Sequence, residues 1–298
     1  MGDAGRRISR DAVLPVHQAN ALTGESPFWD PRTQTIWWID VQGQRLLGFE
    51  PTGGAELAYN LPSMPGLVVG GRRGGLIVGL EDGFYDFERN AGLGVRLVAV
   101  EADDPRTRMN DGKPDATGRL WFGTMEKTGS GAPIGSLYRL GEDGSLRRER
   151  EGLAVPNGIT FTPDGRSFYF ADTRARTIYR HVYDPTAGTI GAAEEFAVYR
   201  SGEAPDGSCA DAEGALWVAV VGGSRVERRL PDGSIHTVID LPVSRPTMPM
   251  LGGADGRTLF ITSQRRFLTA AGLRNEPFAG DLLAVRVEVP AADVHLVA

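Results

Sequence analysis

Short apolar runs, each introduced by a tight turn, recur along the chain and predict an all-β fold. Six times, a turn rich in Asp and Gly leads directly into an apolar strand. These repeats span residues 30–40, 71–80, 115–124, 164–172, 211–220 and 255–263. Their starts lie roughly 40 to 50 residues apart, which is the length of a four-stranded propeller blade. The pattern therefore predicts a six-bladed β-propeller with four-stranded antiparallel blades.

A second, more polar strand follows the repeats and is expected nearer the rim. These segments span residues 45–51, 83–88, 136–144, 177–185, 225–233 and 281–289. To close the ring, residues 13–16 (Val-Leu-Pro-Val) are expected to add a strand to the blade that contains residues 282–289. We expect one domain over residues 1–298, with residues 1–12 as a flexible N-terminal extension.

Composition narrows the classes of partner. Hydrophobic residues make up 41% of the 298, charged residues 23%, and the net charge of −6 predicts no basic face for nucleic acid. Residues 1–12 carry three arginines and no apolar run, so neither a secretory signal nor a membrane span is expected. Together with a single cysteine, this favours a cytoplasmic protein. No obligate protein partner is evident.

The cysteine and histidine usage limits the kind of metal site. Cys209 alone excludes an internal disulfide and any site built from several cysteines. The 4 histidines are scattered and show none of the pairings of a zinc hydrolase. Any bound metal is therefore expected to have mainly oxygen ligands.

Polar residues precede the repeated turn in four blades, where the innermost strand should follow the central channel. They are Glu25, Asn110, Asn157 and Asp206, whereas blades two and six carry residues 65–67 and 249–251, which are mainly apolar. Each Asn-Gly or Asp-Gly pair alone would indicate a turn. Their shared position in the repeat favours a common site instead.

Two carboxylates and two carboxamides in one channel are costly to bury unless a cation balances them. Calcium, magnesium and manganese accept such ligands, and zinc does so with fewer.

Five motifs in order make the chain resemble the gluconolactonase/regucalcin (senescence marker protein-like) family of six-bladed propellers over about residues 22–263. They are Gly-Glu-Ser-Pro-Phe-Trp at 24–29, Arg-Met-Asn-Asp-Gly-Lys at 108–113 with Gly-Thr-Met at 123–125, Pro-Asn-Gly at 156–158, Pro-Asp-Gly-Ser at 205–208, and Pro-Thr at 246–247 with Gly-Gly at 252–253. Ser26 stands where many members of that family have Gly.

The resemblance implies one divalent metal ion (Ca, Mg, Mn, Fe or Zn) held by Glu25, Asn157 and Asp206. It implies that Asn110 lies close to metal-bound water or substrate and that Arg108 contacts substrate oxygens. The family commonly has a carboxylate after Gly-Thr-Met that touches sugar hydroxyls, and here Glu126 follows immediately.

The implied function is metal-dependent hydrolysis of a small sugar lactone to the aldonic acid. In such a reaction the ring ester is polarised at the cation and a carboxylate takes a proton from water. Asp206 is the expected base, with Glu25 second. Two alternatives stay open: a phosphotriesterase-like or aryl-esterase-like hydrolase, and a non-enzymatic calcium-binding propeller. Arg108, Asp111 and Lys113 favour a polar substrate.

Other features have ordinary structural interpretations. The tryptophans fall mostly inside the repeated strands and are predicted to pack within blades, with Trp29 as the one candidate for a sugar contact. Cys209 is expected to be a small buried residue. Arg265 and Arg266 are predicted in a solvated loop, and residues 242–249 at an edge of the channel.

Overall fold

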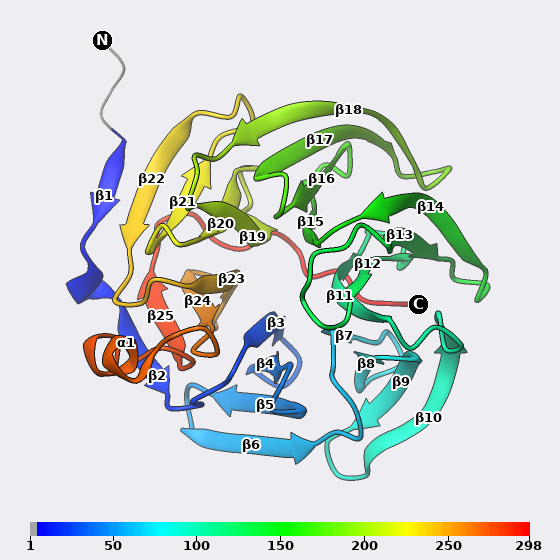
Figure 1. The fold of residues 1–298 in the computed structure, drawn as a ribbon, viewed down its shortest axis with the longest axis horizontal. Helices are drawn as coiled ribbons and strands as arrows, with labels where there is room; N and C mark the ends of the chain where they lie inside the picture. The colour runs from blue at the N-terminus through cyan, green and yellow to red at the C-terminus, as the bar shows by residue number, and fades with distance from the viewer. Residues whose placement is uncertain (1–4) are drawn as a thin grey trace.

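Six antiparallel sheets surround a central axis in the computed structural model, which describes residues 5–298 (Figure 1). In blades one to four the strands follow one another outward in chain order, whereas the N-terminal strands β1 (Arg6–Ile8) and β2 (Leu14–His17) add the outermost strands of blades five and six. This arrangement confirms the predicted six-bladed β-propeller. Blades one to three comprise β3 (Gly24–Asp30), β4 (Thr35–Asp40), β5 (Arg45–Glu50) and β6 (Ala55–Asn60); β7 (Leu67–Gly70), β8 (Leu76–Leu80), β9 (Gly83–Glu88) and β10 (Gly92–Ala99); and β11 (Thr107–Pro114), β12 (Leu120–Glu126), β13 (Gly135–Leu140) and β14 (Leu146–Leu153). Blades four to six comprise β15 (Pro156–Phe161), β16 (Ser167–Asp172), β17 (Thr177–Asp184) and β18 (Thr189–Val198); β19 (Ala204–Ala210), β20 (Leu216–Val221), β21 (Arg225–Arg229) and β22 (Ile235–Asp240); and β23 (Pro246–Gly252), β24 (Thr258–Ser263) and β25 (Leu282–Arg286) with β2 (Leu14–His17).

The repeated turn joins the first and second strands of each blade, and its chemistry is visible in blade three. Asp115 Oδ1 accepts hydrogen bonds from the backbone N–H groups of Thr117 (2.9 Å), Gly118 (2.9 Å) and Arg119 (3.0 Å). Gly118 has a φ of 101°, which a side chain would disfavour. The Asp-x-x-Gly signature therefore encodes a self-capped turn.

The ring closes as the sequence predicts. β2 pairs antiparallel with β25, with Leu14 opposite Ala284 and His17 opposite Leu282. The seam between blades six and one is apolar, since Trp29 stacks on Phe260 with ring centroids 5.8 Å apart. Trp29 is 4% exposed and therefore packs between blades rather than offering a sugar platform.

We expect deletion of residues 1–17 to lower the melting temperature by about 10 °C or more, because a loss of about 1 kcal/mol shifts it by roughly 2–4 °C in large domains. The deletion removes β2 and leaves β25 as an unpaired edge. Deletion of residues 1–8, which spares β2, is the control and should cost less. Thermal unfolding followed by circular dichroism measures both. An unchanged melting temperature for the longer deletion would contradict the closure.

The expected flexible extension over residues 1–12 is wrong for residues 6–12, while residues 1–4 lie outside the described part. β1 (Arg6–Ile8) pairs in parallel with β22 and gives blade five a fifth strand. Arg7 forms a two-pronged ion pair with Asp240, with both contacts at 2.6 Å. A 3-10 turn, η1 (Arg10–Ala12), then leads into β2.

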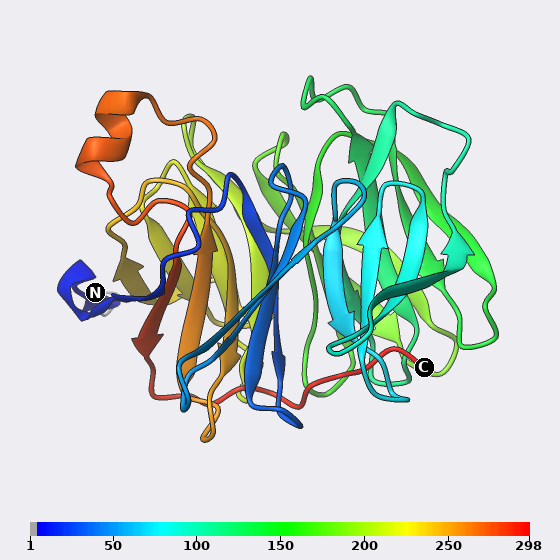
Figure 2. The same cartoon turned by 90° about the horizontal axis from the view of Figure 1, so that it is seen from below.

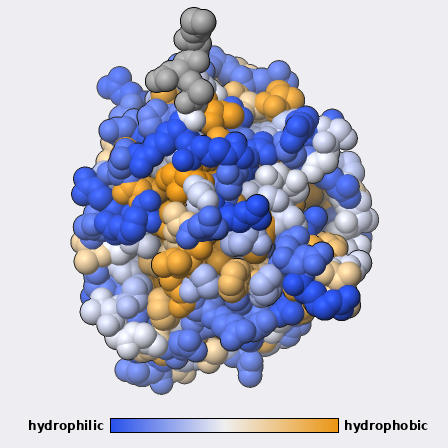
Figure 3. Space-filling view, turned by 90° about the vertical axis from the view of Figure 1, so that its left-hand side faces the viewer, coloured by the Kyte–Doolittle hydropathy of each residue, from blue (hydrophilic) through white to orange (hydrophobic). Residues whose placement is uncertain are grey.

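One short helix, α1 (Ala270–Asn275), lies on the rim between β24 and β25. The side of the ring carrying α1, β1 and β2 is largely hydrophilic, with apolar side chains gathered in limited patches (Figure 3). Within residues 5–298, no helix has the length and apolar character needed to cross a membrane.

The C-terminal segment crosses the face of the ring that carries the repeated turns (Figure 2). Its backbone bonds to four of them: Pro290 O accepts from Ala212 N (3.0 Å), Ala291 N donates to Gly256 O (2.8 Å), Val297 O accepts from Arg72 N (2.8 Å) and Ala298 N donates to Gly118 O (3.2 Å). The segment thus ties the turns of blades five, six, two and three together across the axis.

Candidate functional site

The polar residues of the channel lie at interruptions in strand pairing. In five blades the register between the first and second strands shifts within the innermost strand. The shifts lie between Glu25 and Phe28, Met109 and Gly112, Asn157 and Thr160, Pro205 and Ser208, and Pro246 and Pro249. A bulge bends its strand and re-aims the side chains beside it. The polar residues therefore recur at the same position of the repeat because each lies at the same kind of bulge.

The bulges bring three of the predicted residues into one hydrogen-bonded row. Asn110 Nδ2 donates to Asn157 Oδ1 at 2.6 Å, and Asn157 Nδ2 donates to Asp206 Oδ1 at 2.6 Å. Asn157 Nδ2 also bonds to Thr173 Oγ1 at 2.8 Å. Blades three, four and five therefore contribute adjacent side chains to one site.

Glu25 of blade one completes this site from the facing wall. Burial, and then the negative charges of Asp206 and Asp111, raise the pKa of Glu25 well above its usual range. Burial, and then the charge of Asp111, raise the pKa of Asp206 to about 7. The Glu25 side chain borders the channel and is partly exposed to solvent. The two carboxylates are close enough to repel, so ionising both requires a compensating positive charge.

This donor set fits a hard divalent cation. Two carboxylates and one carboxamide supply oxygen ligands of the kind that calcium, magnesium and manganese prefer. Among residues 5–298, no group of three or more His, Cys, Asp or Glu side chains is arranged to hold a metal ion. Asn157 presents its nitrogen to Asp206 in the structure. Ligation by Asn157 would require this amide to turn over.

Arg108 lies beside the row and is buried, at 9% exposure. Its Nη1 donates to Met109 O at 2.7 Å and to Asn110 Oδ1 at 3.1 Å. Burial lowers the pKa of Arg108 to about 10, so the guanidinium stays charged at neutral pH. The structure therefore places both Arg108 and Asn110, two of the predicted substrate-binding residues, beside Asn157.

Glu126 is occupied within its own loop. Its Oε1 accepts from Thr128 N (2.8 Å), and its Oε2 accepts from Ser130 N (2.7 Å) and Ser130 Oγ (2.8 Å). These bonds, first the one from Thr128, lower the pKa of Glu126 to about 2. Its charge is felt by Arg108, but both of its oxygens are engaged.

Asp111 is buried beside the predicted metal ligands, a position that the sequence pattern did not predict for it. Its Oδ1 accepts from Gly112 N at 2.7 Å and its Oδ2 from Ile159 N at 2.9 Å. It does not pair with Lys113, whose Nζ donates to Ser208 O at 3.1 Å. Asp111 instead joins blades three and four and adds a third negative charge near the two carboxylates.

The channel position of blade six differs from the one read from the sequence. Residues 249–251 lie after the bulge, whereas Thr247 follows Pro246 just as Asp206 follows Pro205. Thr247 Oγ1 donates to Gly24 O at 2.5 Å, which ties blade six to blade one beside Glu25. The predicted segment begins two positions after Thr247, on the far side of the bulge, so the prediction for blade six was wrong.

Ser26 explains why a glycine suits this position. Its φ is 49°, in the left-handed region, and its hydroxyl accepts from Val68 N (3.0 Å) and donates to Val68 O (3.3 Å). We expect Ser26→Ala to lower the free energy of unfolding by about 1–3 kcal/mol, because the buried Val68 N–H loses its acceptor while the strain remains. Ser26→Gly relieves the strain and should cost less. Urea unfolding compares them, and equal stabilities of wild type and Ser26→Ala would contradict this assignment.

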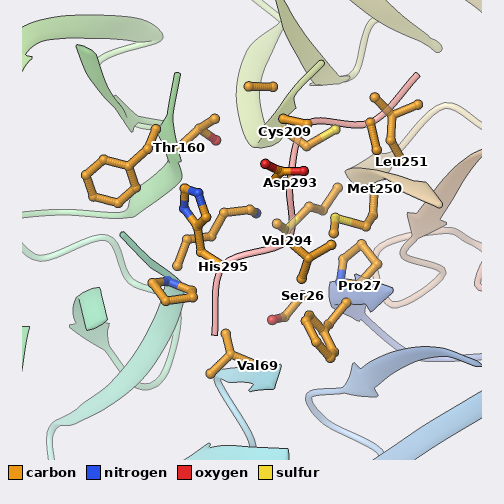
Figure 4. Close-up of a pocket in the computed structure, with 18 of the residues that line it drawn as sticks. Ser26, Pro27, Val69, Thr160, Cys209, Met250, Leu251, Asp293, Val294 and His295 are labelled. Atoms are coloured by element: carbon orange, nitrogen blue, oxygen red, sulfur yellow. The ribbon is translucent and has the colours of Figure 1, made fainter. Parts of the chain in front are cut away.

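A cavity of about 100 Å³ lies further along the channel, toward the turns (Figure 4). Ser26, Thr160 and Cys209 line it from the blades, and Asp293 and His295 line it from the C-terminal segment. Burial raises the pKa of the Cys209 thiol to about 12, so this residue is a packing group as expected. The C-terminal segment covers this end of the channel, whereas Glu25, Asn157 and Asp206 lie near the beginnings of the innermost strands, toward the other end.

Comparisons with known proteins agree with this geometry. Residues 23–265 match the SMP-30/Gluconolactonase/LRE-like region. The 6-deoxy-6-sulfogluconolactonase of Pseudomonas putida is 36% identical, covering 92% of this chain and 94% of that protein. The L-arabinolactonase of Azospirillum brasilense is 34% identical, covering 92% and 91%. The crystal structure of a calcium-binding protein, regucalcin, from Agrobacterium tumefaciens superposes with a TM-score of 0.93 at 28% identity, covering 98% of this chain and 99% of that one. The chain therefore belongs to the SMP-30/gluconolactonase/LRE-like family.

Proposed function

We propose that this protein hydrolyses a small sugar lactone, using one divalent cation held by Glu25, Asn157 and Asp206. The observation that carries the proposal is the pair of buried carboxylates beside a carboxamide, near the beginnings of the innermost strands. The names of the two lactonase relatives support this reaction class. The calcium-binding relative supports a divalent ion.

A bound cation would supply electrostatic stabilisation of the negative charge that develops on the lactone carbonyl oxygen. Asp206 takes the proton from the attacking water, whose oxygen bonds to the carbonyl carbon. The ring C–O bond then breaks, and the ring oxygen leaves as a hydroxyl after receiving this proton from Asp206. Asp206 is suited to act as a base because a cation beside it would keep the carboxylate ionised, while Asn157 Nδ2 holds its Oδ1 at 2.6 Å. Glu25 is the second candidate for this role.

Arg108 and Asn110 orient the substrate in this proposal. Both come from β11 and are already hydrogen-bonded to each other, so little ordering is needed when a lactone binds. Glu126 acts at a distance by holding the loop of residues 128–130 and by its charge on Arg108. A cytoplasmic location remains part of the proposal.

A titration of acid release at constant pH tests the reaction class. Glucono-1,5-lactone, an aryl acetate and a phosphotriester are supplied separately to the purified protein, because each lactone opened, and each rival ester hydrolysed, releases a proton. We expect turnover of the lactone well above that of the other two. Preferred turnover of the aryl ester or phosphotriester would favour the esterase alternative, and no turnover of any ester would favour a calcium-binding scaffold.

A further inference from the structure

Two arginines occupy the same position on opposite walls of the channel mouth. Arg108 immediately precedes Met109, and Arg245 immediately precedes Pro246, the residues at which the register shifts in blades three and six. These blades lie across the ring from each other (Figure 1). In blades four and five, the residues before the matching prolines, Pro156 and Pro205, are Val155 and Ala204. The arginine pair is therefore an addition to the repeat rather than a part of it.

Both guanidinium groups have donor capacity that the protein does not use. Arg108 Nε and Arg245 Nε are buried without a hydrogen-bond partner within the described residues. Arg245 instead lies against an aromatic ring, with its Cζ 5.0 Å from the centroid of Phe267. A guanidinium carries five N–H donors, and burying them unpaired is unfavourable. Such an arrangement is suited to an acceptor that arrives with a ligand.

A third arginine joins them from the loop after β24. Arg266 Cζ lies 5.1 Å from the same Phe267 ring, and its backbone N–H donates to Leu22 O at 3.0 Å. Its positive charge lowers the pKa of Arg108, so the two side chains lie within electrostatic reach. The loop predicted as merely solvated therefore brings positive charge to the channel mouth.

The nearby glutamates are engaged elsewhere. Glu126 is held by its own loop, Glu81 pairs with Lys127 at 2.5 Å, and Glu276 accepts from Ser244 N at 2.7 Å. Glu25 and Asp206 attract Arg108 and Arg245 through space. None of the three arginines, however, forms an ion pair in the part of the chain that the structure describes. Arg245 and Arg266 thus share the Phe267 ring, and Arg266 lies within electrostatic reach of Arg108.

We propose that Arg108, Arg245 and Arg266 bind an oxyanion on the substrate, so that the preferred lactones carry a carboxylate, sulfonate or phosphate group on the carbon chain away from the ring ester. The inference rests on the proposed function, which concerns the lactone ester of the substrate. It adds a binding site for a charged group at the other end of the same substrate. Planar guanidinium forks bind such groups through paired, charge-assisted hydrogen bonds. The site thereby selects anionic over neutral sugar lactones.

Matched substrates test this selectivity. Glucono-1,5-lactone is the neutral substrate, and its 6-phosphate, its 6-sulfonate analogue and glucaro-1,4-lactone carry the three kinds of oxyanion. We expect kcat/KM of the wild-type protein to be about 10-fold or more higher for at least one anionic lactone, with an advantage that shrinks in high salt. A wild-type protein that opens the neutral lactone as fast as all three anionic ones would overturn the proposal.

The variants assign the preference to these side chains. Arg245→Gln should lower the ratio of anionic to neutral kcat/KM about 10-fold, and the more exposed Arg266→Gln about 3-fold, because each removes a charged donor. Arg265→Gln is the matched control, since Arg265 donates to Asn20 instead. Arg245→Lys keeps the positive charge but lacks the paired N–H donors of the guanidinium, and it replaces Arg245→Gln in the assay if that variant folds poorly. An unchanged ratio in both Arg245→Lys and Arg266→Gln would refute the assignment.

Calorimetric binding of products separates this inference from the reaction itself. Gluconate and 6-phosphogluconate share the carboxylate formed at the reacting end and differ at the other end. We expect 6-phosphogluconate to bind about 10-fold more tightly to wild type, and this difference to shrink in Arg266→Gln. If no lactone is hydrolysed but this difference is seen, the proposed function fails and the oxyanion site stands. Equal binding of the two products to wild type would contradict the oxyanion site whether or not lactones are opened.

Discussion

In a steady-state lactonase assay, we expect Asp206→Asn to lower kcat by a factor of about 10² to 10⁴, which is the usual contribution of a general base. The asparagine keeps the size of the side chain and can still accept the bond from Asn157 Nδ2 through its amide oxygen. It cannot take a proton from water, and it is a weaker ligand for a cation. The loss should therefore appear in kcat without loss of the fold.

The control for this substitution is Asp232→Asn, which removes an exposed carboxylate from the turn between β21 and β22. It should leave kcat and the melting temperature close to those of wild type. Turnover of Asp206→Asn close to the wild-type value would exclude Asp206 as the base. Loss of activity in Glu25→Gln with retention in Asp206→Asn would move the role to Glu25.

Removal of bound cations should abolish hydrolysis and make the folded state less stable as the pH rises. Burial raises the folded-state pKa of Asp206 from 3.8 to about 7 and raises that of Glu25, so the folded protein holds these protons more tightly than the unfolded chain. A raised carboxyl pKa contributes stability at low pH that is lost as the pH rises toward the folded pKa. Chelated protein should thus melt at a lower temperature at about pH 8 than at about pH 5.5.

Differential scanning fluorimetry of chelated wild type and Asp206→Asn isolates this effect from other titrating groups. The fall in melting temperature with pH should be smaller in Asp206→Asn, because one of the two costly ionisations is gone. Returning a divalent cation at about pH 8 should raise the melting temperature of wild type, since a ligand that binds only the folded state stabilises it. Identical pH dependence in the two proteins would contradict the burial of an ionised Asp206.

Local chemistry made the ring predictable from the sequence. The Asp-x-x-Gly turn caps itself, as Asp115 shows, and therefore leaves the same residue pattern wherever it occurs. The candidate site residues could be selected from the sequence for a related reason, because residues such as Asn157 and Asp206 lie in short motifs at the same bulge. A feature repeated at a fixed spacing can be read without knowing the tertiary structure.

Features that depend on contacts between distant segments could not be read in this way. β1 is polar and pairs with β22 through its backbone, so no apolar pattern marks it. The structural role of Asp111 could not be predicted, because spacing along the chain cannot show that Ile159 N is its partner. Arg245 and Arg266 meet at Phe267 only because the loop after β24 folds back over the channel.

The metal content of matched proteins tests the central claim most directly. Wild type, Asp206→Asn, Glu25→Gln and the Asp232→Asn control are stripped with chelator, loaded with a single divalent cation, desalted and measured by mass spectrometry. We predict one ion per chain in wild type and in Asp232→Asn, with hydrolysis in proportion to the ion bound. We predict a large loss of bound ion in Asp206→Asn and Glu25→Gln. One ion per chain in both of these variants, or full lactone hydrolysis by the stripped wild-type protein, would contradict the account.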